Sequence, residues 1–261
     1  MLWTRVASGV VLAPLFLALV YAGYPYFHIL IAATAAMMAW EFTRMDGKSG
    51  LKRQVLVSAA SGGAVIAMAL GSPLMALIIV GAAIALVVLI DQFAGRPGLH
   101  VVHIAVAYAV LPAVSLLFVR DAGGYVSVFW VLAVVWATDI GAYAFGRLIG
   151  GPNLAVRISP NKTWSGAIGG LGCAVLASGG LFWAVVAQPG APVIAIAALM
   201  SVMSQAGDLF ESALKRRYGV KDSGALIPGH GGIMDRFDGL WAATPVAAFF
   251  CVLLGGGVQH W

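Results

Sequence analysis

Long apolar runs, each near the length of a bilayer crossing, recur from Val6 to Leu254 and alternate with short polar segments. A helix that crosses the hydrocarbon core needs about 20 predominantly apolar residues. A window of that length predicts spans at 6–23, 27–44, 54–70, 73–91, 101–119, 124–147, 162–187, 192–214 and 237–256. The third and fourth, split by Gly71, Ser72 and Pro73, could instead be re-entrant. The pattern predicts an all-α, polytopic membrane bundle of about nine transmembrane helices.

The composition agrees with this fold class. The chain is 61% hydrophobic and 10% charged, with a mean hydropathy of +0.96, which excludes an ordinary soluble globule. Cys173 and Cys251 lie in apolar runs, so neither a disulfide framework nor a thiolate metal site is expected. The first run could be read as a signal peptide, but its length and the span that follows favour a retained helix. Residues 1–261 therefore form a single transmembrane domain.

The basic residues indicate the orientation of the spans. Of the 15 lysines and arginines, all except Arg120 fall on the same side of the predicted membrane. Because cytoplasmic loops are enriched in Lys and Arg, the N-terminus is expected in the cytoplasm and the C-terminus outside. The net charge of +5 then reflects loops that face anionic headgroups, and no nucleic-acid partner is needed.

Carboxylates near apolar spans are the next informative feature, since each costs about 2.5–3.5 kcal/mol at membrane depth. Asp139 lies inside the predicted sixth span. It either hydrogen-bonds a neighbouring helix or, with Tyr143 one turn later, faces a wet cavity. A polar stripe follows the end of the eighth span and consists of Asp208, Glu211, Ser212 and Lys215. Glu211 and Lys215 could be a simple interfacial pair, whereas Asp208 lies deeper.

The stretch KDSGALIPGHGGIMDRFD gathers six ionisable side chains next to this stripe. Its glycines and proline prevent a continuous helix between Ser223 and Ile233, which predicts a loop whose N–H groups can approach an anion. Asp235 and Asp238 follow at the start of the last helix, where carboxylates alone would be ordinary caps. Together with the stripe, Lys221 and the neighbouring acids, they predict Mg²⁺ and phosphate binding. The chemistry indicated is phosphoryl or nucleotidyl transfer at a membrane surface.

Residues 212–238 resemble the signature of the phosphatidate cytidylyltransferases, the CDP-diacylglycerol synthases. The matching positions are Ser212 to Arg216, Lys221, Asp222 and Pro228 to Asp238. The resemblance extends upstream to Asp139, with Gly141, Ala142 and Tyr143, and to the segment SPNKTW from Ser159 to Trp164. Ser165 departs from the family, which often has an acidic residue there. Residues 1–120 resemble the family only in hydrophobicity and are expected to form the scaffold and dimer contacts, while 121–261 carry catalysis.

The resemblance implies that CTP and phosphatidate react to give CDP-diacylglycerol and pyrophosphate. It further implies Mg²⁺, with K⁺ as a companion ion, a homodimer, and a bacterial-type inner membrane with the active site on the cytoplasmic side. The implied metal ligands are Asp208 and Asp235, followed by Ser212, Asp222 and Asp238.

The resemblance and the local chemistry also assign roles to the remaining candidates. The catalytic set adds Lys215, Lys221 and Arg236 to the acidic residues, because cations offset phosphate charge. The substrate-binding set is Lys162, Ser212, Arg216, His230, Gly231, Gly232 and Asp139. Lys162 is the leading phosphate contact from the preceding loop. His230 is expected to shape the loop or contact phosphate, since an anionic phosphate needs no general base.

Two other functional classes remain open at this stage. A CDP-alcohol phosphotransferase also uses aspartates on a helix, but its pattern requires further aspartates after an Asp-Gly pair, and none follows Gly239. A secondary transporter could use Asp139 and Asp208 as ion sites. Repeated halves and midplane charges would then be expected, whereas these charges collect at the predicted cytoplasmic edge.

Overall fold

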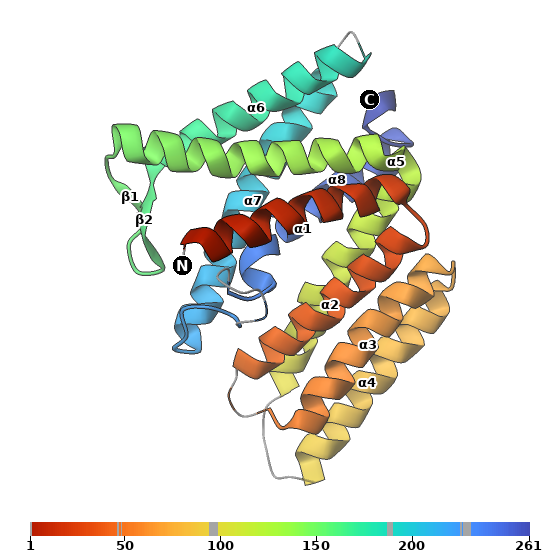
Figure 1. Cartoon of the computed structure of the whole chain (residues 1–261). Helices are drawn as coiled ribbons and strands as arrows, with labels where there is room; N and C mark the ends of the chain where they lie inside the picture. Colours follow the sequence, from red (N-terminus) through yellow and green to blue (C-terminus); the bar gives the residue numbers. More distant parts are fainter. Residues whose placement is uncertain are drawn as a thin grey trace. The chain divides into compact units, whose positions relative to one another are not determined.

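The computed structural model describes residues 2–45, 47, 49–93, 99–186, 190–224, 226 and 231–261. Over these residues the chain is helical apart from one small hairpin and a final 3₁₀ turn (Figure 1). The α-helices are α1 (Leu2–Ala22), α2 (Tyr26–Met45), α3 (Leu51–Ala69), α4 (Pro73–Phe93), α5 (Leu99–Ile149), α6 (Trp164–Val186), α7 (Ala191–Arg217) and α8 (Met234–Leu254). The hairpin consists of β1 (Asn153–Ala155) and β2 (Ser159–Thr163). The all-α class is confirmed, and the hairpin was not expected.

Five helices in the described part of the chain are long and apolar enough to cross a membrane. Their spans are Pro73–Phe93, Val102–Ile149, Trp164–Ala184, Pro192–Arg217 and Met234–His260. A shorter apolar segment, Val10–Ala22, lies in α1. The structure therefore supports a polytopic membrane protein, while the expected number of nine crossings is not confirmed.

Helix α5 contains two of the predicted spans. Its 51 residues would extend about 75 Å as a straight helix, whereas a hydrocarbon core is about 30 Å thick. The helical path is interrupted at Gly124, where φ is 64° and ψ is −167°. A side chain at this position would be strained, so glycine is the residue that permits the break. The interruption falls where the sequence predicts the boundary between spans 101–119 and 124–147.

The chain forms two compact units. The first contains Met1–Leu117 and Val220–Arg236, and the second contains Phe118–Gly219 and Phe237–Trp261. The segment that precedes α8 thus packs with the N-terminal helices. These structural units do not test the predicted functional division at residue 120 into a scaffold part and a catalytic part, which stays a prediction.

Within the first unit, α2 packs against α3, and α3 packs against α4. One face of α2 is fully buried and carries side chains three or four residues apart, about one helical turn, namely Phe27, Ile31, Ala35, Met38 and Phe42. Close approach to α3 occurs at Gly62, where a Cβ would lie 3.2 Å from the Ala32 carbonyl oxygen. Small residues allow such close contact between apolar helices.

Within the second unit, α5 and α6 approach closely through small residues, and α6 packs against α7. A Cβ at Gly166 would lie 2.7 Å from the Ala142 carbonyl oxygen, and one at Gly170 would lie 2.7 Å from that of Thr138. The hydroxyls of Thr138 and Ser201 are 2.9 Å apart and join α5 to α7. This packing places the Asp139 region of α5 beside the first turns of α6.

Candidate functional site

The β1–β2 hairpin positions Lys162. The strands are antiparallel, pairing Asn153 with Thr163 and Ala155 with Ser159. At the start of α6, Thr163 Oγ1 accepts a hydrogen bond of 3.1 Å from the Gly166 N–H, as an N-terminal cap does. Lys162 is therefore fixed at the end of a paired strand, directly before the residue that caps α6.

Ser165 closes the base of this hairpin. Its hydroxyl lies 3.0 Å from Thr163 Oγ1 and donates to the Gly150 carbonyl at the end of α5. This is the position at which the resembling family often has an acidic residue. In this chain the serine ties α5 and the hairpin together through short polar contacts, so the hairpin keeps a defined base without a carboxylate.

Lys162 and Asp208 form an ion pair that joins β2 to α7. Their side chains are 27% and 37% exposed, so both groups remain accessible. The Ser212 hydroxyl, one turn after Asp208, donates to Asp208 Oδ1 over 3.4 Å. The predicted polar stripe on α7 is present, and Asp208, its first residue, pairs with the hairpin lysine.

A cavity of about 430 Å³ opens beside this ion pair within the second unit. The polar residues that line it include Asp139, Tyr143, Arg147, Asn161, Lys162 and Asp208. The structure places Asp139 on the cavity wall, which was one of its two expected positions. The sequence analysis did not include Arg147 among the site residues, although its position one turn after Tyr143 was a signal. Its guanidinium lies 3.4 Å from the tyrosine hydroxyl. The cavity therefore combines two carboxylates with two cations.

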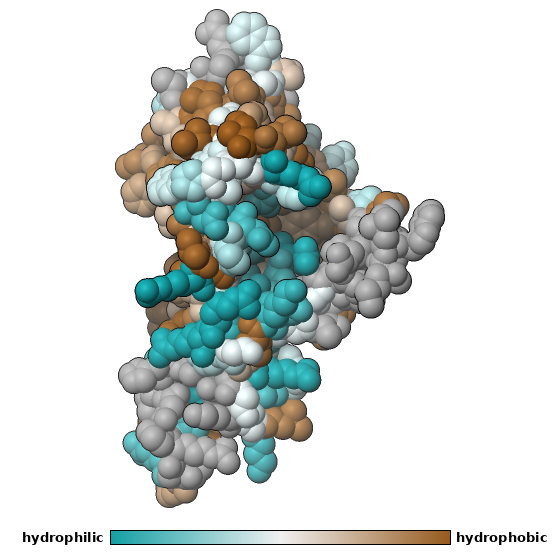
Figure 2. All heavy atoms as spheres, turned by 90° about the vertical axis from the view of Figure 1, so that its left-hand side faces the viewer, coloured by the Kyte–Doolittle hydropathy of each residue, from teal (hydrophilic) through white to brown (hydrophobic). Residues whose placement is uncertain are grey.

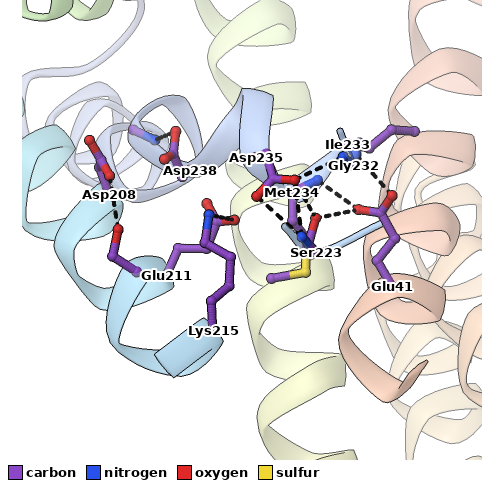
Figure 3. A network of polar contacts seen from close by, with 12 residues as sticks. Glu41, Asp208, Glu211, Lys215, Ser223, Gly232, Ile233, Met234, Asp235 and Asp238 are labelled. Atoms are coloured by element: carbon purple, nitrogen blue, oxygen red, sulfur yellow. Dashed lines mark hydrogen bonds and ion pairs between the residues drawn. The ribbon is translucent and has the colours of Figure 1, made fainter. Parts of the chain in front are cut away.

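Glu211 and Lys215, which follow Asp208 along the α7 stripe, are largely buried and form an ion pair. The Glu211 side chain has no exposed surface, and its Oε1 lies 3.1 Å from Lys215 Nζ one turn later (Figure 3). The carboxyl group of Asp238 on α8 neighbours both Glu211 and Asp208. Its Oδ1 also accepts a hydrogen bond of 2.7 Å from the Gly239 N–H. A simple pair of Glu211 with Lys215 at the membrane interface was one of the alternatives left open by the sequence, and the pairing is present with Glu211 fully buried.

Hydrophilic side chains gather on the face that carries the hairpin and the end of α7, below the hydrophobic surface over α6 (Figure 2). Arg216 and Arg217 at the end of α7 are exposed, and Arg216 Nε donates to the Ile158 carbonyl over 3.4 Å. Arg216, predicted to bind substrate, therefore also links α7 to the hairpin.

In the first unit, Asp235 organises the described part of the loop before α8. Its Oδ2 accepts hydrogen bonds from the Gly232 N–H at 2.8 Å, the Ser223 N–H at 3.0 Å and the Ser223 hydroxyl at 3.1 Å (Figure 3). Lys221, Asp222 and Arg236 are exposed. Gly231 adopts a φ of 83°, in agreement with its expected loop position. His230 lies outside the described residues.

Glu41 on α2 was missed by the sequence analysis. It is only 1% exposed, and its carboxylate accepts hydrogen bonds from the N–H groups of Ile233 and Met234 at 3.0 and 2.9 Å. The Ser223 hydroxyl lies 3.1 Å from Glu41 Oε2. The one available sequence signal was its position as the first acidic residue of the chain, inside an apolar run.

The donor chemistry suits a hard divalent cation. The acidic candidates present carboxylate oxygens and Ser212 a hydroxyl oxygen, which Mg²⁺ prefers over softer ligands. Among the described residues, no group of three or more His, Cys, Asp or Glu side chains could hold a metal ion. Because Mg²⁺ is commonly bound by one or two carboxylates together with substrate phosphates, the available oxygens fit a site that substrate completes.

Comparison with known proteins extends over nearly the whole chain. The sequence pattern of the cytidylyltransferase family matches residues 3–254. The phosphatidate cytidylyltransferases of Brucella suis and Brucella melitensis are each 40% identical over 95% of this chain and 93% of their own length. The phosphatidate cytidylyltransferase of Bacillus subtilis is 44% identical over 51% of this chain and 50% of its own length. The chain therefore belongs to the cytidylyltransferase family.

Proposed function

We propose that this chain is a phosphatidate cytidylyltransferase of phospholipid biosynthesis, a membrane-embedded nucleotidyltransferase. It transfers CMP from CTP to phosphatidate and produces CDP-diacylglycerol and pyrophosphate. The observation that carries this conclusion is the 40% identity to relatives of that name over 95% of the chain. The cavity of the second unit adds a physical reason, because Lys162 and Arg147 supply cations for phosphate groups beside Asp208 and Asp139.

The reaction joins two anions, and its main barrier is their mutual repulsion. A phosphate oxygen of phosphatidate attacks the α-phosphorus of CTP, and the bond from that phosphorus to the bridging oxygen of the β-phosphate breaks. Pyrophosphate leaves with the bonding electron pair. Because the attacking phosphate is already anionic near neutral pH, no general base is required. Positioning and charge stabilisation therefore supply the catalysis.

The chain's own residues have distinct parts in this proposal. Lys162, held by the hairpin, contacts phosphate oxygens from the cavity wall, and Arg147 adds a second cation there. Lys215 is assigned to the leaving pyrophosphate, with Lys221 and Arg236 from the segment before α8. Asp139, which also lines the cavity, is proposed to contribute to substrate binding. These roles extend the sequence-based assignments by one residue, Arg147.

Mg²⁺ is the cofactor that these oxygen donors fit, and when bound it would supply positive charge that offsets the charge of the phosphate groups. Asp208 and Asp235 are the proposed principal ligands, with Ser212, Asp222 and Asp238 as further oxygen donors. K⁺ is the proposed companion ion. Lys162 would exchange its partner Asp208 for phosphate as substrate enters, since the pair is accessible.

The proposed topology has nine crossings, with the N-terminus and the active site on the cytoplasmic side of a bacterial-type inner membrane. The segregation of nearly all basic residues to the same side of the predicted spans supports this orientation. The break at Gly124 supports two crossings within α5. A homodimer is proposed from the family resemblance.

The function is tested by incubating purified protein with phosphatidate and CTP, dCTP or ATP in parallel and identifying products by mass spectrometry. CDP-diacylglycerol and pyrophosphate are expected from CTP in the presence of Mg²⁺, with no adenylated lipid from ATP. Release of CMP from added CDP-diacylglycerol and an alcohol, without CTP consumption, would instead identify a CDP-alcohol phosphotransferase. Absence of any nucleotide conversion in protein of native stability would contradict both enzymatic assignments.

A further inference from the structure

Glu41 connects the first half of the chain to the start of α8. The residue lies near the end of α2, surrounded by apolar side chains that make this helix face part of the core. A carboxylate that is 1% exposed costs considerable free energy unless its oxygens are hydrogen-bonded. Glu41 meets this requirement through partners that come from residues 223–234 (Figure 3).

The partners of Glu41 are groups that a helix start leaves without an intrahelical acceptor. The first N–H groups of any α-helix point out of its N-terminus, and a negative charge is stabilised there. Ile233 and Met234 donate to Oε1 and Oε2 of Glu41, respectively, so the two carboxylate oxygens hold two consecutive peptide groups. This bidentate contact fixes both the position and the direction of the chain where α8 begins.

Ser223 joins Glu41 to Asp235. Its hydroxyl is 3.1 Å from Glu41 Oε2 and 3.1 Å from Asp235 Oδ2, while its N–H donates to Asp235. A hydroxyl has one proton and can donate to one carboxylate at a time, so the two acids are linked through a shared donor. The position of Asp235 therefore depends on Glu41 through both Ser223 and the peptide groups of residues 233 and 234.

The Glu41 carboxylate packs closely against two glycines of the segment before α8, where there is no room for a side chain. A Cβ at Gly224 would lie 2.6 Å from Glu41 Oε1, and a Cβ at Gly232 would lie 2.6 Å from Glu41 Oε2. Two glycines of the segment thus make room for this carboxylate. The contact is a specific fit between α2 and the segment before α8.

We propose that Glu41 is a positioning residue for nucleotidyl transfer, which holds the segment with Asp235, Asp222 and Lys221 in its reactive conformation. This inference rests on the proposed function, and it assigns part of the reaction to α2, a helix in the part of the chain expected to form the scaffold and dimer contacts. Glu41 touches backbone groups and a serine, so it acts through the residues that it places. A glutamine cannot replace it, because its NH₂ group would face peptide N–H donors.

The test compares Glu41→Gln with Thr43→Val in the full-length, purified protein. Thr43 is a matched control, because it is buried two residues later and, among the described residues, its hydroxyl bonds to the carbonyls of Ala39 and Trp40 in its own helix. In Glu41→Gln, kcat/KM for CTP is expected to fall by about 100-fold, as for other small displacements of reacting groups. The Mg²⁺ concentration for half-maximal activity is expected to rise, while Thr43→Val behaves as wild type in both respects.

Ser223→Ala provides a second variant that keeps both carboxylates and removes their shared donor. It is expected to change the CTP and Mg²⁺ dependence in the same direction as Glu41→Gln, but by less. If Glu41→Gln does not fold, this variant decides the question. Unchanged CTP and Mg²⁺ dependence in Ser223→Ala would then overturn the proposal.

A purely structural role predicts a different result for Glu41→Gln, namely a lower Tm with unchanged KM for CTP and unchanged Mg²⁺ dependence in the folded fraction. That result would overturn the proposal. If the wild type shows no turnover, the proposed function fails separately. Glu41 is then judged by hydrogen exchange at the Ile233 and Met234 amides, where faster exchange in Glu41→Gln supports positioning and unchanged exchange overturns it.

Discussion

Lys162 of the β1–β2 hairpin and Asp208 of α7 form an ion pair on the wall of the second unit's cavity. Both side chains can exchange this partner for a substrate or an ion. A phosphate group can replace Asp208 as the partner of Lys162, and a cation can replace Lys162 as the partner of Asp208. We therefore expect the ion pair to separate when substrate binds.

Lys162→Met tests the phosphate contact. The substitution keeps much of the side-chain length and removes the charge, so kcat/KM for CTP and phosphatidate is expected to fall by about 100-fold. Arg157→Gln is the matched control, because Arg157 is an exposed cation in the same hairpin that does not line the cavity. Equal activity of the two variants in the turnover assay would show that Lys162 does not bind a substrate phosphate.

Asp208→Ala tests the carboxylate that accompanies Lys162. Mg²⁺-dependent conversion of CTP and phosphatidate is expected to be abolished, because no other described side chain pairs with both Lys162 and Ser212 in the same way. The Asp208 side chain is 37% exposed, so membrane insertion and Tm are expected to remain near wild type. Near-normal turnover at any Mg²⁺ concentration would exclude Asp208 as an essential ligand.

Asp235→Ala is expected to impair both activity and stability. Its carboxylate accepts three hydrogen bonds through Oδ2 from Gly232 and Ser223, so its removal leaves these donors without that partner. Loss of a comparable cap costs about 1 kcal/mol of unfolding free energy. Thermal unfolding in detergent should show a lower Tm than for Asp208→Ala. If Asp235→Ala loses neither stability nor activity, both its capping and its proposed metal-binding role are wrong.

The apolar pattern predicted the helices well, because a bilayer-length apolar run is a local property of the sequence. The predicted boundary between spans 101–119 and 124–147 also coincides with the interruption of α5 at Gly124, although the sequence analysis did not single out this glycine. The β1–β2 hairpin was missed because its strands are short and polar, as in the residues Ser159 to Thr163. The ion pair between Lys162 of this hairpin and Asp208 of α7 was not predicted either, because the sequence analysis assigned Lys162 to phosphate and Asp208 to the metal.

Glu41 could not be identified from the sequence for a different physical reason. Its partners are two peptide N–H groups and a serine far along the chain, and peptide groups leave no residue-type signature. Asp235 shows the converse case. The sequence singled it out for metal binding, while its capping contacts with Ser223 and Gly232 follow from the loop geometry.

Gly232→Ala tests the tight packing around these two carboxylates. A Cβ at this position would lie 2.0 Å from the Ser223 hydroxyl oxygen and 2.6 Å from Glu41 Oε2, so the Ser223 and Glu41 side chains or the segment itself must shift. Turnover is expected to fall by at least about tenfold, since small displacements of reacting groups are costly. Gly81→Ala is the control, because nothing lies within 4 Å of a Cβ there. Wild-type turnover in Gly232→Ala would show that the segment tolerates rearrangement.

The most direct measurement follows the phosphorus atoms of CTP during turnover by the purified wild-type protein with phosphatidate. With label in the α-phosphate, radioactivity is predicted to enter the chloroform-extractable lipid in a Mg²⁺-dependent manner. With label in the γ-phosphate, it is predicted to appear only in pyrophosphate. Label from the γ-position in lipid, or α-label that remains entirely in water-soluble compounds, would contradict nucleotidyl transfer by this chain.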